Sequence, residues 1–198
     1  MSHSCRLCWV CFCLLLVMGC SGTVRPPDLA VPEVSTPTAD AVRLVDMSEQ
    51  ALLVARRTAA DAMLRQVDTD LNTFTFRFTD NAATQEIDVY VPAPNATSDQ
   101  WTIQLNSVSP LLGQPRPGLE LAALRVGPQR VAQAVFAQWP GCVLRSMTLY
   151  SEGDILTWVA FCDTAEGVVT GSMNNQTGIF QPVSAPPAQL PVTATPQP

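Results

Sequence analysis

The stretch that decides the fold is Thr73-Phe74-Thr75-Phe76-Arg77-Phe78-Thr79, in which phenylalanine alternates with polar residues. Alternation with a period of two puts the three aromatic rings on one face of a β-strand and the polar side chains on the other. The segments 86–91 and 101–106 alternate in the same way. The three segments therefore predict an antiparallel sheet with one buried face.

An alanine-rich segment precedes these strands. It opens at Asp46-Met47-Ser48-Glu49, where Asp46 and Glu49 suit a capping box. Its apolar residues then follow helical spacing through Val67. We expect a helix over 46–67 that covers the buried face of the sheet.

The same order of elements recurs downstream. A helix is expected from Gly127-Pro128 to about 139, a hairpin over 142–150 and 155–163, and a third strand over 167–173. The sequence thus predicts an α+β fold with two tandem helix-on-antiparallel-sheet (α-β-β-β) units, 46–112 and 122–182.

The second unit resembles the PepSY domain. The resemblance rests on the helix that ends in Trp139-Pro140-Gly141, on Trp158 in the hairpin, and on the closing residues 175–179. It implies two tandem PepSY-like units. It also implies the role ascribed to that family, which is to restrain peptidases or to bind partner proteins. Such a likeness implies no catalytic residue.

The cysteines divide into two groups. Of the seven, four precede Cys20, and only Cys142 and Cys162 follow it. The expected hairpin brings Cys142 opposite residue 162 or 163, which favours a disulfide between the two cysteines over two buried thiols.

The beginning of the chain has the form of an export signal. Residues 7–18 are apolar and uncharged, but the run is shorter than the roughly 20 residues that a transmembrane helix needs. The segment Val17-Met18-Gly19-Cys20 resembles the lipobox of bacterial lipoproteins. It predicts a signal peptide over 1–19 and lipidation, as with palmitate, of Cys20. A plain secretory signal and a membrane anchor are the alternatives.

Proline-rich segments flank the expected domain. Residues 20–45 are expected to be a disordered tether, and residues 183–198 a disordered tail. With a lipid on Cys20, the domain is expected in the cell envelope, on the outer face of the cytoplasmic membrane or on the outer membrane.

Composition excludes several functions. The net charge is -6 without any lysine, which disfavours binding to nucleic acid. The sole histidine, His3, lies in the expected signal peptide, so neither histidine-based catalysis nor a usual zinc site is expected. Asp68-Thr69-Asp70-Leu71-Asn72 begins like a calcium loop, but residues 73 and 79 are not the required glycine and glutamate. We expect no metal, no cofactor and no enzymatic activity.

A protein-binding role is the remaining expectation. Thr148, Tyr150 and Trp158 are expected on one face of the hairpin, either exposed to an extracytoplasmic partner or buried between the two units. The sequence therefore predicts a membrane-anchored, non-enzymatic binding module. A structural or assembly lipoprotein of an envelope complex is the alternative, followed by an enzyme based on carboxylates.

Overall fold

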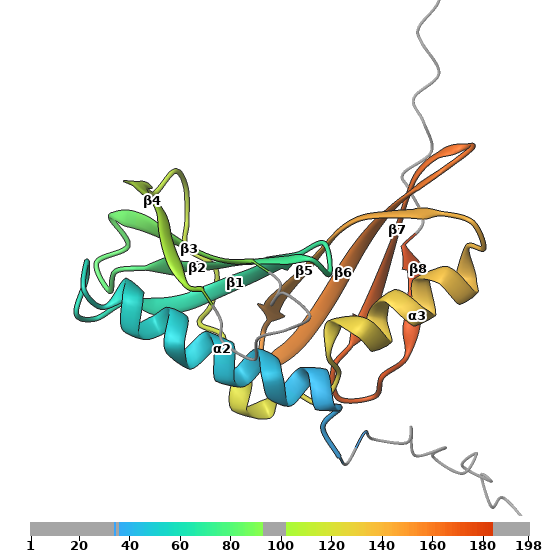
Figure 1. Ribbon diagram of the computed structural model, residues 1–198, viewed down its shortest axis with the longest axis horizontal. Helices are drawn as coiled ribbons and strands as arrows, with labels where there is room; N and C mark the ends of the chain where they lie inside the picture. Colours follow the sequence, from blue (N-terminus) through green and yellow to red (C-terminus); the bar gives the residue numbers. More distant parts are fainter. Residues whose placement is uncertain (1–33, 35, 93–101, 184–198) are drawn as a thin grey trace, which may run out of the picture. The chain divides into compact units, whose positions relative to one another are not determined.

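The structure, a computed structural model, describes residues 34, 36–92 and 102–183. In this part of the chain eight strands form one antiparallel sheet in the order β4-β3-β2-β1-β5-β6-β7-β8 (Figure 1). The strands are β1 (Met63–Thr69), β2 (Thr73–Thr79), β3 (Gln85–Pro92), β4 (Gln104–Pro110), β5 (Val143–Glu152), β6 (Ile155–Thr164), β7 (Gly167–Asn174) and β8 (Phe180–Val183). The helical elements are α2 (Ala39–Ala55), the 3-10 turn η1 (Leu121–Ala123) and α3 (Pro128–Gln138).

The expectation of two tandem helix-on-sheet units, 46–112 and 122–182, is wrong, because the fold is a single sheet with two short helices. The two halves join where β1 pairs with β5, and at this seam Asp68 lies opposite Thr148. An unpaired strand edge exposes backbone N–H and C=O groups, and the pairing of β1 with β5 satisfies them. The buried side chains of both halves belong to one core.

The central strand β1 occupies residues for which the alanine spacing predicts helix. Ala59 and Ala62 continue that spacing, but they lie in the connection between α2 and β1. Both alanines are buried, so their spacing reflects burial and does not indicate a helix. At the other end, α2 begins well before Asp46 and Glu49, which therefore lie inside the helix and do not cap it.

The alternation in β2 is confirmed. Phe76 and Phe78 have no exposed surface and Phe74 is 8% exposed, whereas Arg77 is half-buried on the opposite face. β3 pairs with β2 in register, with Val89 opposite Phe76, and it buries the same face. These two strands bury Phe74, Phe76, Phe78, Ile87, Val89 and Val91 on that face.

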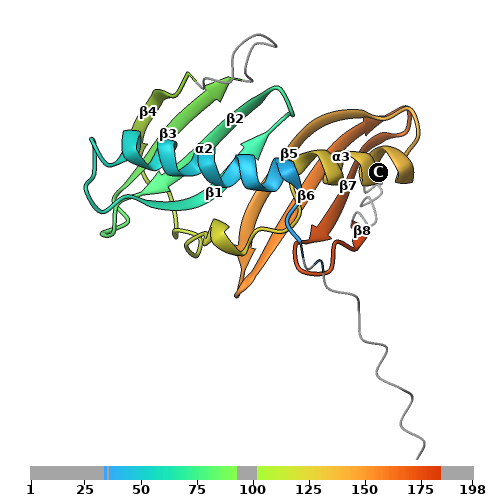
Figure 2. The same ribbon diagram turned by 60° about the horizontal axis from the view of Figure 1, so that its bottom comes forward.

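Both helices cover the same face of the sheet. Val67 of β1 lies opposite Leu149 of β5 and both are fully buried, so the buried faces of the two halves are continuous. On this face α2 packs against β2, β3 and β4, and α3 packs against β5, β6 and β8. Figures 1 and 2 show the helices on one side of the strands. The opposite side, which we call the open face, carries no helix in the residues described.

Two buried polar side chains fix the segment that leads into α3. Asn175, 1% exposed, accepts hydrogen bonds at Oδ1 from the backbone N–H groups of Arg125 and Val126, at 2.7 and 3.0 Å. Its Nδ2 donates to the carbonyl of Ala123 at 2.9 Å, and Trp158 Nε1 donates to the carbonyl of Val126 at 2.8 Å. Because a buried polar group without a partner costs about 1–3 kcal/mol, these contacts hold the segment in place.

Candidate functional site

Most side chains on the open face are polar, and we consider this face the candidate functional site. The strand register places residues of seven strands on this face. They include Gln66, Asp68, Thr75, Arg77, Glu86, Asp88, Tyr90, Ser107, Thr148, Tyr150, Thr157, Val159, Phe161, Thr170 and Ser172. Their side chains point away from the helices, because neighbouring side chains in a strand point to opposite faces.

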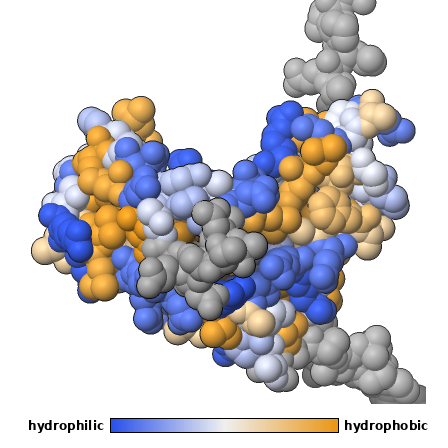
Figure 3. Space-filling view, in the orientation of Figure 1, coloured by the Kyte–Doolittle hydropathy of each residue, from blue (hydrophilic) through white to orange (hydrophobic). Residues whose placement is uncertain are grey.

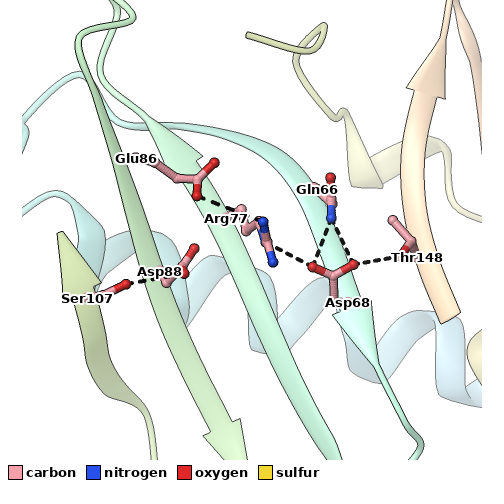
Figure 4. Close-up of polar contacts among 7 residues, drawn as sticks. All are labelled: Gln66, Asp68, Arg77, Glu86, Asp88, Ser107 and Thr148. Atoms are coloured by element: carbon pink, nitrogen blue, oxygen red, sulfur yellow. Dashed lines mark hydrogen bonds and ion pairs between the residues drawn. The ribbon is translucent and has the colours of Figure 1, made fainter. Parts of the chain in front are cut away.

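Asp68 is the central polar residue of the open face (Figure 4). Its Oδ1 accepts hydrogen bonds from Thr148 Oγ1 at 2.7 Å and from Gln66 Nε2 at 2.8 Å. Its Oδ2 lies 2.9 Å from Nε of Arg77, as an ion pair. Since these partners lie on β5, β1 and β2, one carboxylate ties three neighbouring strands together across the seam.

The polar row continues from Arg77 to the edge of the sheet. Arg77 Nη1 lies 3.8 Å from Glu86 Oε1, and Ser107 Oγ donates to Asp88 Oδ2 at 3.2 Å. The side chain of Arg77 is 40% exposed, so its ion pairs contribute at most about 1 kcal/mol each. The contact of Arg77 Nε with Asp68 is an ion pair without hydrogen-bond geometry, and Asp88 Oδ1 makes no hydrogen bond within the described residues. A second guanidinium lies beside this row, since Arg65 Nε donates to Thr79 Oγ1 at 2.9 Å and Thr79 is the strand partner of Glu86.

Two aromatic side chains and one valine of β5 and β6 lie on the open face beside the polar row. Tyr150, Val159 and Phe161 are all half-buried on the open face. The guanidinium carbon of Arg116 lies 4.7 Å from the centre of the Tyr150 ring, a cation–π contact. The half-buried Thr157 lies directly opposite Tyr150. The face therefore offers aromatic area, hydroxyl groups and charges within a few neighbouring strands.

The three residues that the sequence predicts on one face of the hairpin lie on two different faces in the structure. Thr148 and Tyr150 are on the open face, but Trp158 has no exposed surface and lies opposite Leu149 on the face covered by the helices. Including Trp158 in the interaction face is thus wrong. On β6 the open positions are taken by Val159 and Phe161 instead. The cause is the register of the β5–β6 hairpin, since the face of every side chain in a strand follows from it.

The disulfide between Cys142 and Cys162 is confirmed. The Sγ atoms are 2.07 Å apart and the Cα atoms 5.9 Å apart. Cys162 is fully buried and Cys142 is 9% exposed, so the bond links the loop after α3 to β6 on the side of the core. It lies on the face opposite to the candidate site.

The expected lipidation site, Cys20, lies outside the described residues, as do the signal peptide, most of the tether and the tail. The helix α2 begins at Ala39, inside the segment expected as a tether. Among the described helices, none combines the length and the apolar character that crossing a bilayer requires.

The calcium-like segment is a turn between β1 and β2. Asp70 Oδ1 accepts hydrogen bonds from the backbone N–H groups of Asn72 and Thr73, at 2.9 and 2.8 Å, and from Thr73 Oγ1. Burial by itself raises the pKa of Asp70, but these hydrogen bonds outweigh it and hold the pKa below the usual value. In the described residues no three His, Cys, Asp or Glu side chains cluster in a way that could hold a metal ion.

A groove of about 670 Å³ lies on the helical side, between α2, the start of β1 and residues 118–122. Its walls are largely apolar and include Leu52, Phe78 and Leu119, together with the charged Glu49 and Arg56. This arrangement does not resemble a catalytic constellation, which would bring a nucleophile, a base and an orienting group into contact.

Comparisons with known proteins give one structural likeness. No family model matches the chain, and no curated protein does, so the resemblance to PepSY is not confirmed. The fold is similar to the crystal structure of a "putative lipoprotein" from Clostridium difficile 630. The two share 14% sequence identity with a TM-score of 0.46, over 74% of this chain and 90% of the other.

Proposed function

We propose that this chain is a lipid-anchored lipoprotein of the cell envelope whose open face binds another extracytoplasmic protein, without catalysis. The anchor in this proposal is a lipid on Cys20, and its support is the sequence Val17-Met18-Gly19-Cys20 after a short apolar run. The binding role is supported by the open face, which lies opposite both helices.

The observation that carries the binding role is the side-chain composition of the open face. Tyr150 and Phe161 supply large, rigid contact area, and Thr148, Thr157 and Ser172 supply hydroxyl groups that can donate or accept hydrogen bonds. Rigid aromatic side chains surrounded by small hydroxyl residues are what protein-recognition surfaces use, since they lose little conformational entropy on binding.

The charges of the open face are nearly balanced. Asp68 and Glu86 form ion pairs with Arg77, and Asp88 lies opposite Arg77 on the next strand. Two further cations contact this face, Arg65 at Thr79 and Arg116 at Tyr150. Because charges of both signs are present, net charge does not select the partner, and the partner that we propose is a protein that contacts the aromatic and hydroxyl side chains of this face.

A cross-linking experiment tests this assignment. A photoreactive amino acid is placed at Thr157, on the open face, or at Leu53 of α2, which is 63% exposed on the helical side. The full-length lipoprotein is cross-linked in its native cells and the captured protein is identified. We expect one defined protein to be captured from position 157 and not from position 53.

The captured protein is then purified and titrated against two matched variants, Thr157→Arg and Leu53→Arg. We expect Thr157→Arg to weaken binding at least about tenfold, because a long cation in the middle of an interface disrupts its packing. Leu53→Arg should leave the affinity unchanged. Equal capture from both positions, or unchanged binding by Thr157→Arg, would contradict the proposal.

A further inference from the structure

The two edge strands of the sheet differ in how they are protected. β8 has only 4 residues and contains Pro182, so it is short and lacks one backbone N–H. β4 has 7 residues, and its only proline, Pro110, is the last of them. In the part of the chain that the structure describes, no strand pairs with the outer side of β4. One edge is therefore blocked, and the other presents free N–H and C=O groups.

The side chains of β4 do not protect this edge either. From Thr102 to Pro115 the sequence contains no charged residue, although charges are the usual means of keeping foreign strands away from an edge. All residues of β4 are exposed, and Leu105 and Val108 keep 48% and 45% of their surface accessible. Figure 3 shows hydrophobic surface over β4, at the upper left.

We propose that β4 pairs antiparallel with β4 of a second copy of this chain, so that the two sheets join edge to edge. Charge favours a second copy at this place. The whole chain has a net charge of -6, so most of its surface repels another copy, whereas the uncharged β4 brings no like charges together.

The blocked edge favours a closed pair. Among the described strands, those left at the edges of an assembly of two chains joined through β4 are the two β8 strands, each with Pro182. A further chain therefore finds no open edge, and growth stops at two copies, as in other twofold-symmetric oligomers. The pairing also supplies partners for the free backbone groups of β4.

The geometry of antiparallel pairing fixes the faces of the dimer. The twofold axis is perpendicular to the sheet, so both open faces lie on one side and both α2 helices on the other. Leu105 and Val108 lie opposite Val89 and Ile87, whose side chains are on the face covered by α2. The exposed apolar side chains of β4 thus meet those of the second copy on the helical side.

Sedimentation of the full-length lipoprotein in detergent tests this dimer. The solvent density is matched to that of the detergent, so that the bound detergent does not contribute to the measured mass. We compare the natural chain with Val108→Lys on β4 and with Val183→Lys on β8. The two valines are 45% and 47% exposed, so either lysine reaches solvent in the single chain and the fold is kept. The natural chain and Val183→Lys should sediment as two copies. Val108→Lys should weaken the dimer at least tenfold, because it brings two cations close together across the axis.

Hydrogen exchange gives a second readout. The amides of β4 should exchange more slowly as the concentration of the natural chain rises, and those of Val108→Lys should not. A natural chain that sediments as one copy at its highest soluble concentration overturns the proposal. Assemblies larger than two copies, or equal dissociation of Val108→Lys and Val183→Lys, overturn it as well.

Discussion

Asp40 in the first turn of α2 caps the N-terminus of the other helix, α3. Its Oδ2 accepts a hydrogen bond from the backbone N–H of Gln129 at 2.8 Å, and Thr38 Oγ1 accepts one from the N–H of Gly127 at 2.9 Å. Gly127 is the N-cap residue of α3 and has no side chain with which to cap the helix itself. A side chain there would also collide with the carboxylate of Asp40. The start of α3 therefore depends on residues far earlier in the chain.

Asp40→Ala should lower the free energy of unfolding by about 0.5–2 kcal/mol, the usual cost of losing an N-cap acceptor. Urea unfolding followed by circular dichroism measures it. The control is Asp46→Ala, on the exposed side of the same helix, which should change stability by less than about 0.5 kcal/mol. Equal losses in the two variants would show that the contact between the helices contributes nothing.

The core of the first half can be tested with two neighbouring residues of β2. Phe76→Ala removes a fully buried ring and should cost about 3–5 kcal/mol. Thr75→Ala, on the open face, should cost less than about 1 kcal/mol. Chemical denaturation of both variants measures the change in the free energy of unfolding. Similar, small changes in the two variants would contradict the assignment of Phe76 to the buried face of β2.

The sequence predicts those parts of the fold in which local pattern and burial agree. β2 and β3 alternate cleanly because one face of each is buried and the other is open, so their residues and faces follow from the sequence alone. β1 has only Val67 and Thr69 buried in an alternating pattern, directly after a run of alanines with helical spacing. Without the long-range pairing to β5, nothing local distinguishes it from the end of a helix.

The candidate site is less predictable, since it depends on register. Whether Trp158 or Phe161 faces the core depends on which residues of β5 and β6 are paired, and a shift of one residue exchanges the two faces. The contact between Asp68 and Thr148 joins residues 80 positions apart, so no local pattern reveals it. The sequence shows only that each of the two is a polar residue beside an apolar one.

The disulfide should be a main source of stability for the second half of the sheet. Cys142 and Cys162 are separated by 20 positions, and closing a loop of this length stabilises the folded state by about 3 kcal/mol. Adding a reductant should lower the free energy of unfolding by about this amount. The double variant Cys142→Ala/Cys162→Ala serves as the control and should not respond to reductant. A natural chain whose urea midpoint is unchanged on reduction would disagree with this expectation.

The pH dependence of stability should reflect Asp80. The hydroxyl of Thr84 and the backbone N–H of Gln85 hold the pKa of the Asp80 carboxyl below its usual value, against the effect of desolvation. A pKa that is lower in the folded state means that the carboxylate contributes stability above the unfolded pKa of about 3.9. That contribution is lost as the pH falls below about 4 and through the folded pKa.

The variant Asp80→Asn isolates this contribution, because its side chain does not titrate. It should be less stable than the natural chain at pH 6, and the difference should shrink as the pH is lowered toward 3, where only the natural chain loses the bonds of its carboxylate. Thermal unfolding at a series of pH values shows the trend. A difference that stays constant over this range would refute the role of Asp80.

Binding through the open face is tested most directly by calorimetric titration of the captured partner with two variants, Tyr150→Ala on the open face and Leu53→Ala on the helical side. Tyr150 is half-buried on β5, whereas Leu53 of α2 is 63% exposed and lies outside the residues assigned to binding. Tyr150→Ala should raise the dissociation constant at least about tenfold, as expected for an aromatic anchor, and Leu53→Ala should leave it unchanged. Unchanged affinity in Tyr150→Ala, or an equal loss in both variants, would contradict binding through this face.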